Sequence, residues 1–355
     1  MKIDRKNGLK AINGGLFLGG GGGGTVQGGL EVLESSLKHG NIELYSIEEF
    51  NDDDYILTAS LVGSPASKEK YVGEDHYKTV YELFKFNYDK NIFGVITNEM
   101  GAQSITNGWM ISAATKIPLI DAPCNGRAHP TGTMGSMGLS KVENYETIQT
   151  AVGGKGDKEI QIVVKGNLKQ TSLAVRNAAS LAGGFVTVLR NPVTAAYIKK
   201  NAAVNSIKQA IRIGEIFIEN KGKLDIILKE LSDYLNSIVV CEGFIENYSL
   251  KTQNGFDIGD IGINSNGDIY DVVFWNEYMT IENNGVRIAT FPDLIAIIDK
   301  KTCLPLTSAD IKEQAEVVLV KVPMDKLILG GGMFDKNLFI ESEKVIDKKI
   351  VEYVF

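Results

Sequence analysis

Cysteine, histidine and proline are scarce in this chain of 355 residues. It has three cysteines, three histidines and eight prolines. The cysteines, Cys124, Cys241 and Cys303, are odd in number and far apart, so we expect reduced thiols in a cytoplasmic protein and no disulfide framework. Apolar runs such as Leu294–Ile298 fall far short of the ~20 residues that a membrane helix needs, and no signal-peptide core follows the N-terminus. A net charge of −7 without a basic cluster makes a nucleic-acid partner unexpected.

The composition is that of an ordinary globular protein, with 44% hydrophobic and 23% charged residues. A chain of this length predicts two domains, because single cores rarely grow so large. The expected N-terminal strands are Ile42–Ile47, Tyr55–Gly63, Ile92–Gly101 and Ile117–Pro123, and the expected helices between them are Gly29–Gly40, Tyr77–Lys90 and Gly108–Lys116. This alternation predicts a layered α/β domain with a mostly parallel sheet, whose ligand crevice lies outside the carboxyl ends of the strands.

The second half of the chain changes character near Asn236. The stretch Asn167–Asn236 is mostly helical by its apolar spacing, with one strand-like interruption at Gly184–Asn191. Short β-type runs separated by polar turns follow, which predicts a smaller β-rich domain, a barrel or a sandwich. We therefore expect an α/β domain at 1–236 and a β-rich domain at 237–325, with 326–355 packing back on the first domain.

Six consecutive glycines, Gly19–Gly24, form a run that permits three interpretations. It could cradle a phosphate, line a small-molecule site through the backbone of Gly20, Gly21, Gly22 and Gly23, or mark a tight chain crossing. No Lys-Ser or Lys-Thr pair follows, so a P-loop is excluded. The residues before the run fit a helix better than the strand that a dinucleotide fold requires, so nucleotide binding is the weakest of the three.

A proline-bracketed loop, PCNGRAHP (Pro123–Pro130), carries much of the chain's reactive chemistry. Glu99 closes one expected strand and Asp121 another, so both carboxylates and this loop should meet at one edge of a parallel sheet. Either carboxylate could act as a general base, and His129 could give or take a proton.

The other loop residues have functional and structural interpretations. Arg127 could grip a substrate carboxylate or stabilise an oxyanion, Cys124 could be a nucleophile, and Asn125 and Gly126 could contact substrate. Alternatively, Asp121 caps a turn, Arg127 forms a structural bridge to Glu99, and Cys124 is inert packing. No HxH, CxxC or HExxH spacing supports a metal, so the metal and any cofactor stay unknown.

Five motifs in one order carry a family resemblance: FLGGGGGG near the N-terminus, NEMG, IDAPCNGRAHP, FWNEYM and FPDLIAIID. Over essentially its whole length the chain resembles the S-methyl thiohydantoin desulfurase-like family, long catalogued as a domain of unknown function. Members are often encoded beside hydantoinase and oxoprolinase enzymes. The resemblance implies an α/β domain joined to a β-rich domain, and hydrolytic replacement of ring sulfur by oxygen on a hydantoin-like cyclic amide.

The resemblance also implies roles for residues of the later motifs. Asn276, Glu277 and Asp293 would contact substrate if they face the same crevice; the alternative is that they pack within the β domain. The chain departs from the family pattern at four positions, where Ser104 replaces Asn, Pro123 and Thr131 replace acidic residues, and His129 replaces an aromatic residue. These departures leave open a different substrate or a member that binds without turnover.

Three functions thus remain: an enzyme acting on a thiohydantoin-like ring, a non-catalytic small-molecule-binding subunit or sensor, and a nucleotide-dependent enzyme using Gly19–Gly24. The expected partner is a small-molecule substrate, without nucleic acid or membrane. Exposed strand edges make a homo-oligomer one option, and the resemblance adds hydantoinase- or oxoprolinase-type subunits as another.

Overall fold

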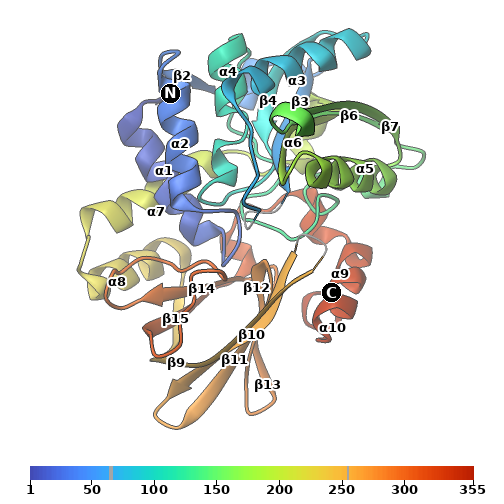
Figure 1. The fold of residues 1–355 in the computed structure, drawn as a ribbon. Coiled ribbons are helices and arrows are strands. Elements are labelled where there is room, and N and C mark those ends of the chain that lie inside the picture. The colour runs from blue at the N-terminus through green and yellow to red at the C-terminus, as the bar shows by residue number, and fades with distance from the viewer. Residues whose placement is uncertain (64–66, 254–255) are drawn as a thin grey trace.

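The computed structural model describes residues 1–63, 67–253 and 256–355, and it contains two sheets in two domains, one above the other in Figure 1. The strands of the first sheet, in spatial order, are β1 (Lys2–Ile3), β2 (Ile42–Tyr45), β5 (Leu119–Ile120), β4 (Ile92–Thr97), β3 (Tyr55–Gly63), β8 (Phe185–Thr194), β6 (Thr147–Gly153) and β7 (Ile160–Gly166). The neighbours β2, β5, β4 and β3 pair in parallel. The remaining pairs are antiparallel, so the sheet is mixed.

The α/β class is confirmed, and the parallel part coincides with the segment where strands and helices alternate in the sequence. The strand expected at Tyr55–Gly63 has those bounds. Apart from the short β1, which pairs with β2, the antiparallel part comes from β6, β7 and β8. The strands β6 and β7 are joined by a short connection with no helix of full length. A short connection between adjacent strands allows only antiparallel pairing.

Helices pack against this sheet and against one another. They are α1 (Arg5–Leu18), α2 (Val26–Leu37), α3 (Glu74–Asn87), α4 (Trp109–Thr115), α5 (Leu168–Leu181), α6 (Ala195–Asn201), α7 (Ser206–Glu219) and α8 (Leu224–Leu235). The helices α1 and α7 cross closely because glycine stands at both contact points. A Cβ on Gly14 would lie 1.7 Å from the Ala210 carbonyl oxygen, and one on Gly214 would lie 1.7 Å from that of Lys10. Figure 1 shows the two helices side by side.

The second sheet is antiparallel throughout. Its strands, in spatial order, are β13 (Val286–Thr290), β12 (Glu277–Asn283), β11 (Asp268–Trp275), β10 (Phe256–Ser265), β9 (Ile238–Gln253), β15 (Glu316–Val322) and β14 (Leu294–Asp299). Asn-Gly pairs turn two of its hairpins, with positive φ at Asn266 and Gly267 and at Asn284 and Gly285, as such tight turns require. The sheet curls so that β12 contacts β14, and it encloses an apolar core of its own.

After β15 the chain returns to the first domain. A Cβ on Gly330 would lie 1.8 Å from the Cys124 carbonyl oxygen, and one on Gly332 would lie 1.9 Å from that of Met134. The start of the short 3-10 helix Gly331–Phe334 therefore passes directly against the loop after β5. The helices α9 (Lys336–Ile346) and α10 (Val351–Val354) then pack beside the β-rich domain. In the described parts of the chain, the three cysteines are unpaired and buried, and no helix is long and apolar enough to cross a membrane.

Candidate functional site

A cavity of about 1100 Å³ lies between the two domains. The first domain contributes the carboxyl ends of β3 and β4, the residues after His129 and one side of α5. The second contributes the Asn276–Glu277 apex between β11 and β12, the segment 307–309 and part of α9. The crevice thus lies where parallel α/β sheets hold ligands, outside the carboxyl ends of the strands.

The glycine run forms part of the cavity wall and contacts both domains. The carbonyl oxygen of Gly20 accepts from Tyr278 N (2.7 Å) and that of Gly21 from Ser308 N (2.8 Å), both in the β-rich domain. On the other side, Gly23 accepts from the backbone N–H groups of Gln103 and Ser104, each at 3.0 Å. The run is therefore a tight crossing between domains as well as a cavity wall.

Close approach explains why side chains are absent from the run. A Cβ on Gly22 would lie 1.9 Å from Oε1 of Glu277. Gly20 has φ of +51°, and a Cβ there would lie 2.8 Å from Nη2 of Arg127. The backbone N–H groups of Gly21, Gly23 and Gly24 have no acceptor in the described protein, and these three residues line the cavity. They are available as donors to a ligand.

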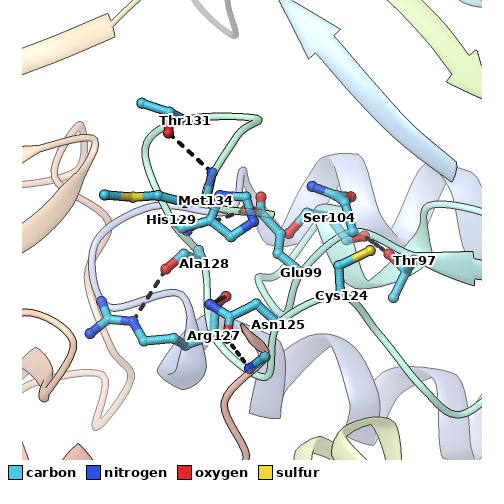
Figure 2. A network of polar contacts seen from close by, with 12 residues as sticks. Thr97, Glu99, Ser104, Cys124, Asn125, Arg127, Ala128, His129, Thr131 and Met134 are labelled. Atoms are coloured by element: carbon cyan, nitrogen blue, oxygen red, sulfur yellow. Dashed lines mark hydrogen bonds and ion pairs between the residues drawn. The ribbon is translucent and has the colours of Figure 1, made fainter. Parts of the chain in front are cut away.

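Most of the loop Pro123–Pro130 turns out to be structural (Figure 2). The Sγ atom of Cys124 lies 3.2 Å from Oγ1 of Thr58 in the interior, and burial raises the pKa of this thiol to about 11. Asn125 accepts from Gly330 N at 3.1 Å, and a Cβ on Gly126 would lie 1.9 Å from the Ile328 carbonyl oxygen. None of these loop residues lines the cavity, so nucleophilic chemistry at Cys124 finds no support.

Arg127 reaches into the β-rich domain and stays outside the cavity lining. Its Nη1 donates to the carbonyl oxygens of Pro292 (3.0 Å) and Asp293 (2.5 Å), and its guanidinium lies 4.4 Å from the centre of the Phe291 ring. No ion pair to Glu99 forms among the described residues. The carboxylate of Asp293 accepts from Met324 N at 2.9 Å and likewise faces away from the cavity.

The side chain of Asp121 lies against the N-terminus of α7, where its carboxylate accepts hydrogen bonds from Ile207 N (2.8 Å) and Lys208 N (3.3 Å). Only 1% of the residue is exposed. Burial raises the pKa of this carboxyl to about 6, against the opposing effect of the two backbone donors. Asp121 therefore caps a helix. The sequence predicts it beside Glu99 in the site, but it does not line the cavity.

His129 and Glu99 are the loop and strand-end residues that do meet in the cavity (Figure 2). Oε2 of Glu99 lies 3.3 Å from the backbone N of His129 and 3.3 Å from its Nε2. Neither ring nitrogen makes a full hydrogen bond to the described protein. Burial lowers the pKa of His129, outweighing the nearby Glu99 charge that raises it. The lowered pKa favours the neutral imidazole, which sits against a carboxylate.

Arg190, on β8, was missed by the sequence reasoning. It lines the cavity, is only 4% exposed, and has no hydrogen-bond or ion-pair partner for its guanidinium within the described residues. Burial lowers its pKa, while the nearby Cys124 thiol and Glu99 carboxylate raise it. Arg176 on α5 also lines the cavity and lies 4.3 Å over the Phe256 ring. An arginine inside the apolar run VTVLRN was the available signal, because such a charge is rarely buried without a partner.

Glu277 sits at the apex between β11 and β12 and is 2% exposed. Its Oε2 has no hydrogen-bond partner in the described structure. Burial raises the pKa of Glu277 well above its usual range; the Glu99 charge adds to this and the Arg127 charge opposes it. Asn276, which precedes it, lines the cavity too, although its Oδ1 accepts from Asp257 N at 2.9 Å.

The predicted site residues thus fall into two groups. Those at the cavity are Gly21, Gly22, Gly23, Glu99, His129, Asn276 and Glu277. Those away from it are Gly20, Asp121, Cys124, Asn125, Gly126, Arg127 and Asp293. Two carboxyl groups do converge, but the second is Glu277 in place of Asp121. No group of three or more His, Cys, Asp and Glu in the described residues could hold a metal ion.

Comparison with known proteins gives a consistent match. The model of the S-Me-THD-like N-terminal domain matches residues 9–161, and that of the S-Me-THD-like C-terminal domain matches residues 166–329. A crystal structure of a protein from Chromobacterium violaceum is similar in fold, with a TM-score of 0.69, 14% identity, and coverage of 97% of this chain and 96% of that one. No curated protein matches the sequence. The two domain models meet between residues 161 and 166, so the division near Asn236 stays a prediction.

Proposed function

This chain belongs to the S-Me-THD-like family, and from that membership we propose that it hydrolyses a thiohydantoin-like ring, replacing the sulfur substituent of the ring carbon by oxygen. The observation that supports this most directly is the cavity, in which two carboxyl groups, Glu99 and Glu277, and the unpaired cation of Arg190 face one volume. For an S-methyl thiohydantoin, the products would be a hydantoin and methanethiol.

Glu99 is the proposed base, with the neutral His129 ring beside it. Water adds to the ring carbon that carries sulfur, and one proton of that water passes to the Glu99 carboxylate. The backbone N–H of His129, 3.3 Å from Oε2 of Glu99, holds the carboxylate in place, and the neutral ring beside it adds no positive charge. A positioned carboxylate of this kind contributes about 100-fold or more to proton transfer.

Negative charge develops on the ring nitrogen and its neighbouring carbonyl as water adds. Arg190 would meet this charge, since its guanidinium is buried at the cavity without a protein partner. The free backbone N–H groups of Gly21, Gly23 and Gly24 would supply neutral donors to the same ring. Fixed donors of this type stabilise the transition state because they need no reorientation when charge appears.

The test is direct turnover of S-methyl-2-thiohydantoin by the purified protein. Released methanethiol is followed with a thiol reagent, and mass spectrometry in ¹⁸O-labelled water shows whether solvent oxygen enters the ring. We expect both products in equal amounts. Glu99→Gln should lower kcat/KM by about 100-fold or more, while Glu313→Gln, at an exposed site on the β-rich domain, should not change it.

Two outcomes would count against the proposal. Ring binding seen by thermal shift without any product would favour a binding subunit or sensor, the second function left open by the sequence. A thermal shift with nucleotides and none with hydantoins would favour the nucleotide-dependent alternative.

A further inference from the structure

Glu277 is the buried ionisable group at the cavity to which the mechanism above gives no task. Its side chain comes from the second domain and faces the same volume as Glu99, which comes from the first. The glycine run leaves room for this side chain. A Cβ on Gly22 would lie only 1.9 Å from Oε1 of Glu277, so the carboxyl group can occupy its position only because residue 22 is glycine. A side chain at Gly22 would displace this carboxyl group.

The surroundings of Glu277 do not favour a negative charge. No ion pair to its carboxyl group forms within the described chain, and Oε2 lies in the interior without a donor. The charged groups near it are Glu99, which repels a second negative charge, and Arg127, which attracts it. Nη1 of Arg127 donates to carbonyl oxygens of the loop after β13, and its Nη2 makes no hydrogen bond or ion pair to Glu277 within the described chain. The backbone N–H of Glu277 itself favours the ionised form, but burial outweighs it. A buried carboxyl group with so little support for its charge stays protonated instead.

Glu99 has the opposite environment. Its Oε2 lies 3.3 Å from a backbone N–H donor at His129, and its side chain is more exposed to the cavity than that of His129. Two carboxyl groups in one site with unlike surroundings divide into a base and an acid. We propose that Glu277 is held as a neutral carboxylic acid and protonates the departing sulfur, an assignment that rests on the proposed function.

The proton balance closes over one turnover. Water gives one proton to Glu99, and its oxygen forms the new bond to the ring carbon. The carbon–sulfur bond then breaks, its electron pair leaves on sulfur, and Glu277 delivers a proton to give the free thiol. The hydroxyl of the adduct returns its proton to Glu277 as the carbonyl forms, and Glu99 protonates the ring nitrogen.

Leaving-group dependence tests the assignment. Glu277→Gln keeps the size of the side chain but has no proton to transfer. For S-methyl-2-thiohydantoin we expect kcat/KM to fall by about 100-fold or more. For the S-(4-nitrophenyl) analogue, whose thiolate leaves without protonation, we expect a fall of less than about tenfold. Equal losses on both substrates would overturn the acid role and leave Glu277 as a positioning residue.

The matched control is Glu282→Gln on the same strand. Burial opposes ionisation there, but ion pairs with Lys348 and Arg287 prevail and lower the pKa of Glu282. This variant should leave the ratio of kcat/KM for the two substrates unchanged. Circular dichroism and melting curves of both variants check that each is folded.

Infrared difference spectroscopy separates this inference from the proposed function. At pH 7 the wild-type minus Glu277→Gln spectrum should show the carbonyl band of a protonated carboxylic acid, and the Glu282→Gln difference should show only ionised carboxylate bands. A missing protonated band refutes a neutral Glu277 whatever the activity. A protein that converts neither thiohydantoin refutes the proposed function and the acid role with it, while the band still decides the protonation state.

Discussion

Asp121→Asn should change how stability depends on pH while leaving turnover intact. The folded protein raises the pKa of Asp121 from 3.8 to about 6, because its carboxyl is buried at the N-terminus of α7. The unfolded chain exposes the group, which then ionises near its ordinary pKa. Between these two values the unfolded state releases a proton that the folded state keeps, so the free energy of unfolding falls as pH rises.

The size of this effect follows from the two pKa values. Each pKa unit corresponds to about 1.4 kcal/mol, so the shift of about 2 units corresponds to about 3 kcal/mol. The contribution is fully present below pH 3.8 and is lost as pH rises to about 6. Asparagine does not titrate, so the Asp121→Asn variant lacks this loss altogether, apart from a constant offset caused by its changed hydrogen bonds to Ile207 and Lys208.

Urea unfolding of both proteins at intervals between pH 3.5 and 7.5 measures the difference. The free energy of unfolding of the wild type minus that of the variant should fall by about 3 kcal/mol as the pH rises through this range. Thiohydantoin turnover should be the same in both proteins. A difference in unfolding free energy that is flat with pH would refute the burial argument. A loss of turnover comparable with that of Glu99→Gln would return Asp121 to the mechanism.

Two further predictions concern the cavity. Arg190→Met should raise the melting temperature, because it removes a buried charge that has no protein partner within the described residues. It should also lower kcat/KM by about 100-fold or more, because in the proposed mechanism this charge stabilises the reacting ring. A lower melting temperature, measured by differential scanning fluorimetry, would contradict this. Gly22→Ala should lower kcat/KM by about tenfold to 100-fold, since its Cβ would displace Glu277 from the site. Gly40→Ala meets nothing within 4 Å but is strained by the φ of +100° at this residue, so it is the control for a loss of stability away from the cavity. Equal activity of the two variants in the thiol-release assay would count against a role for the Gly22 contact.

The sequence predicts those parts of the fold whose signals are local. The strand Tyr55–Gly63 and the polar turns of the second sheet, two of them Asn-Gly pairs, appear as expected, because periodicity and turn chemistry act over a few residues. The hairpin of β6 and β7 was not expected. Its buried strand β6 mixes polar and apolar residues, and the threonine and glutamine side chains there bond to partners such as Asn191 and Thr171. A polar strand with such distant partners has no local signature.

The site was predictable only in part for the same reason. Glu99 could be placed at the cavity because the carboxyl end of a parallel strand points there. Asp121 follows the neighbouring strand, yet it bonds to α7, more than eighty residues later in the chain. Arg190 lies in the antiparallel half of the sheet, which the expectation of a parallel sheet did not include. In each case a contact distant in sequence decided the outcome.

The glycine run has a consequence for how the two halves of the protein move. Its carbonyl groups are hydrogen-bonded to Tyr278 and Ser308 on one side and to Gln103 and Ser104 on the other. Any rotation of the β-rich half relative to the α/β half would have to bend this segment, and with it the wall that a ring would rest on. We therefore expect a ligand that rests on this wall to oppose rotation of the two halves.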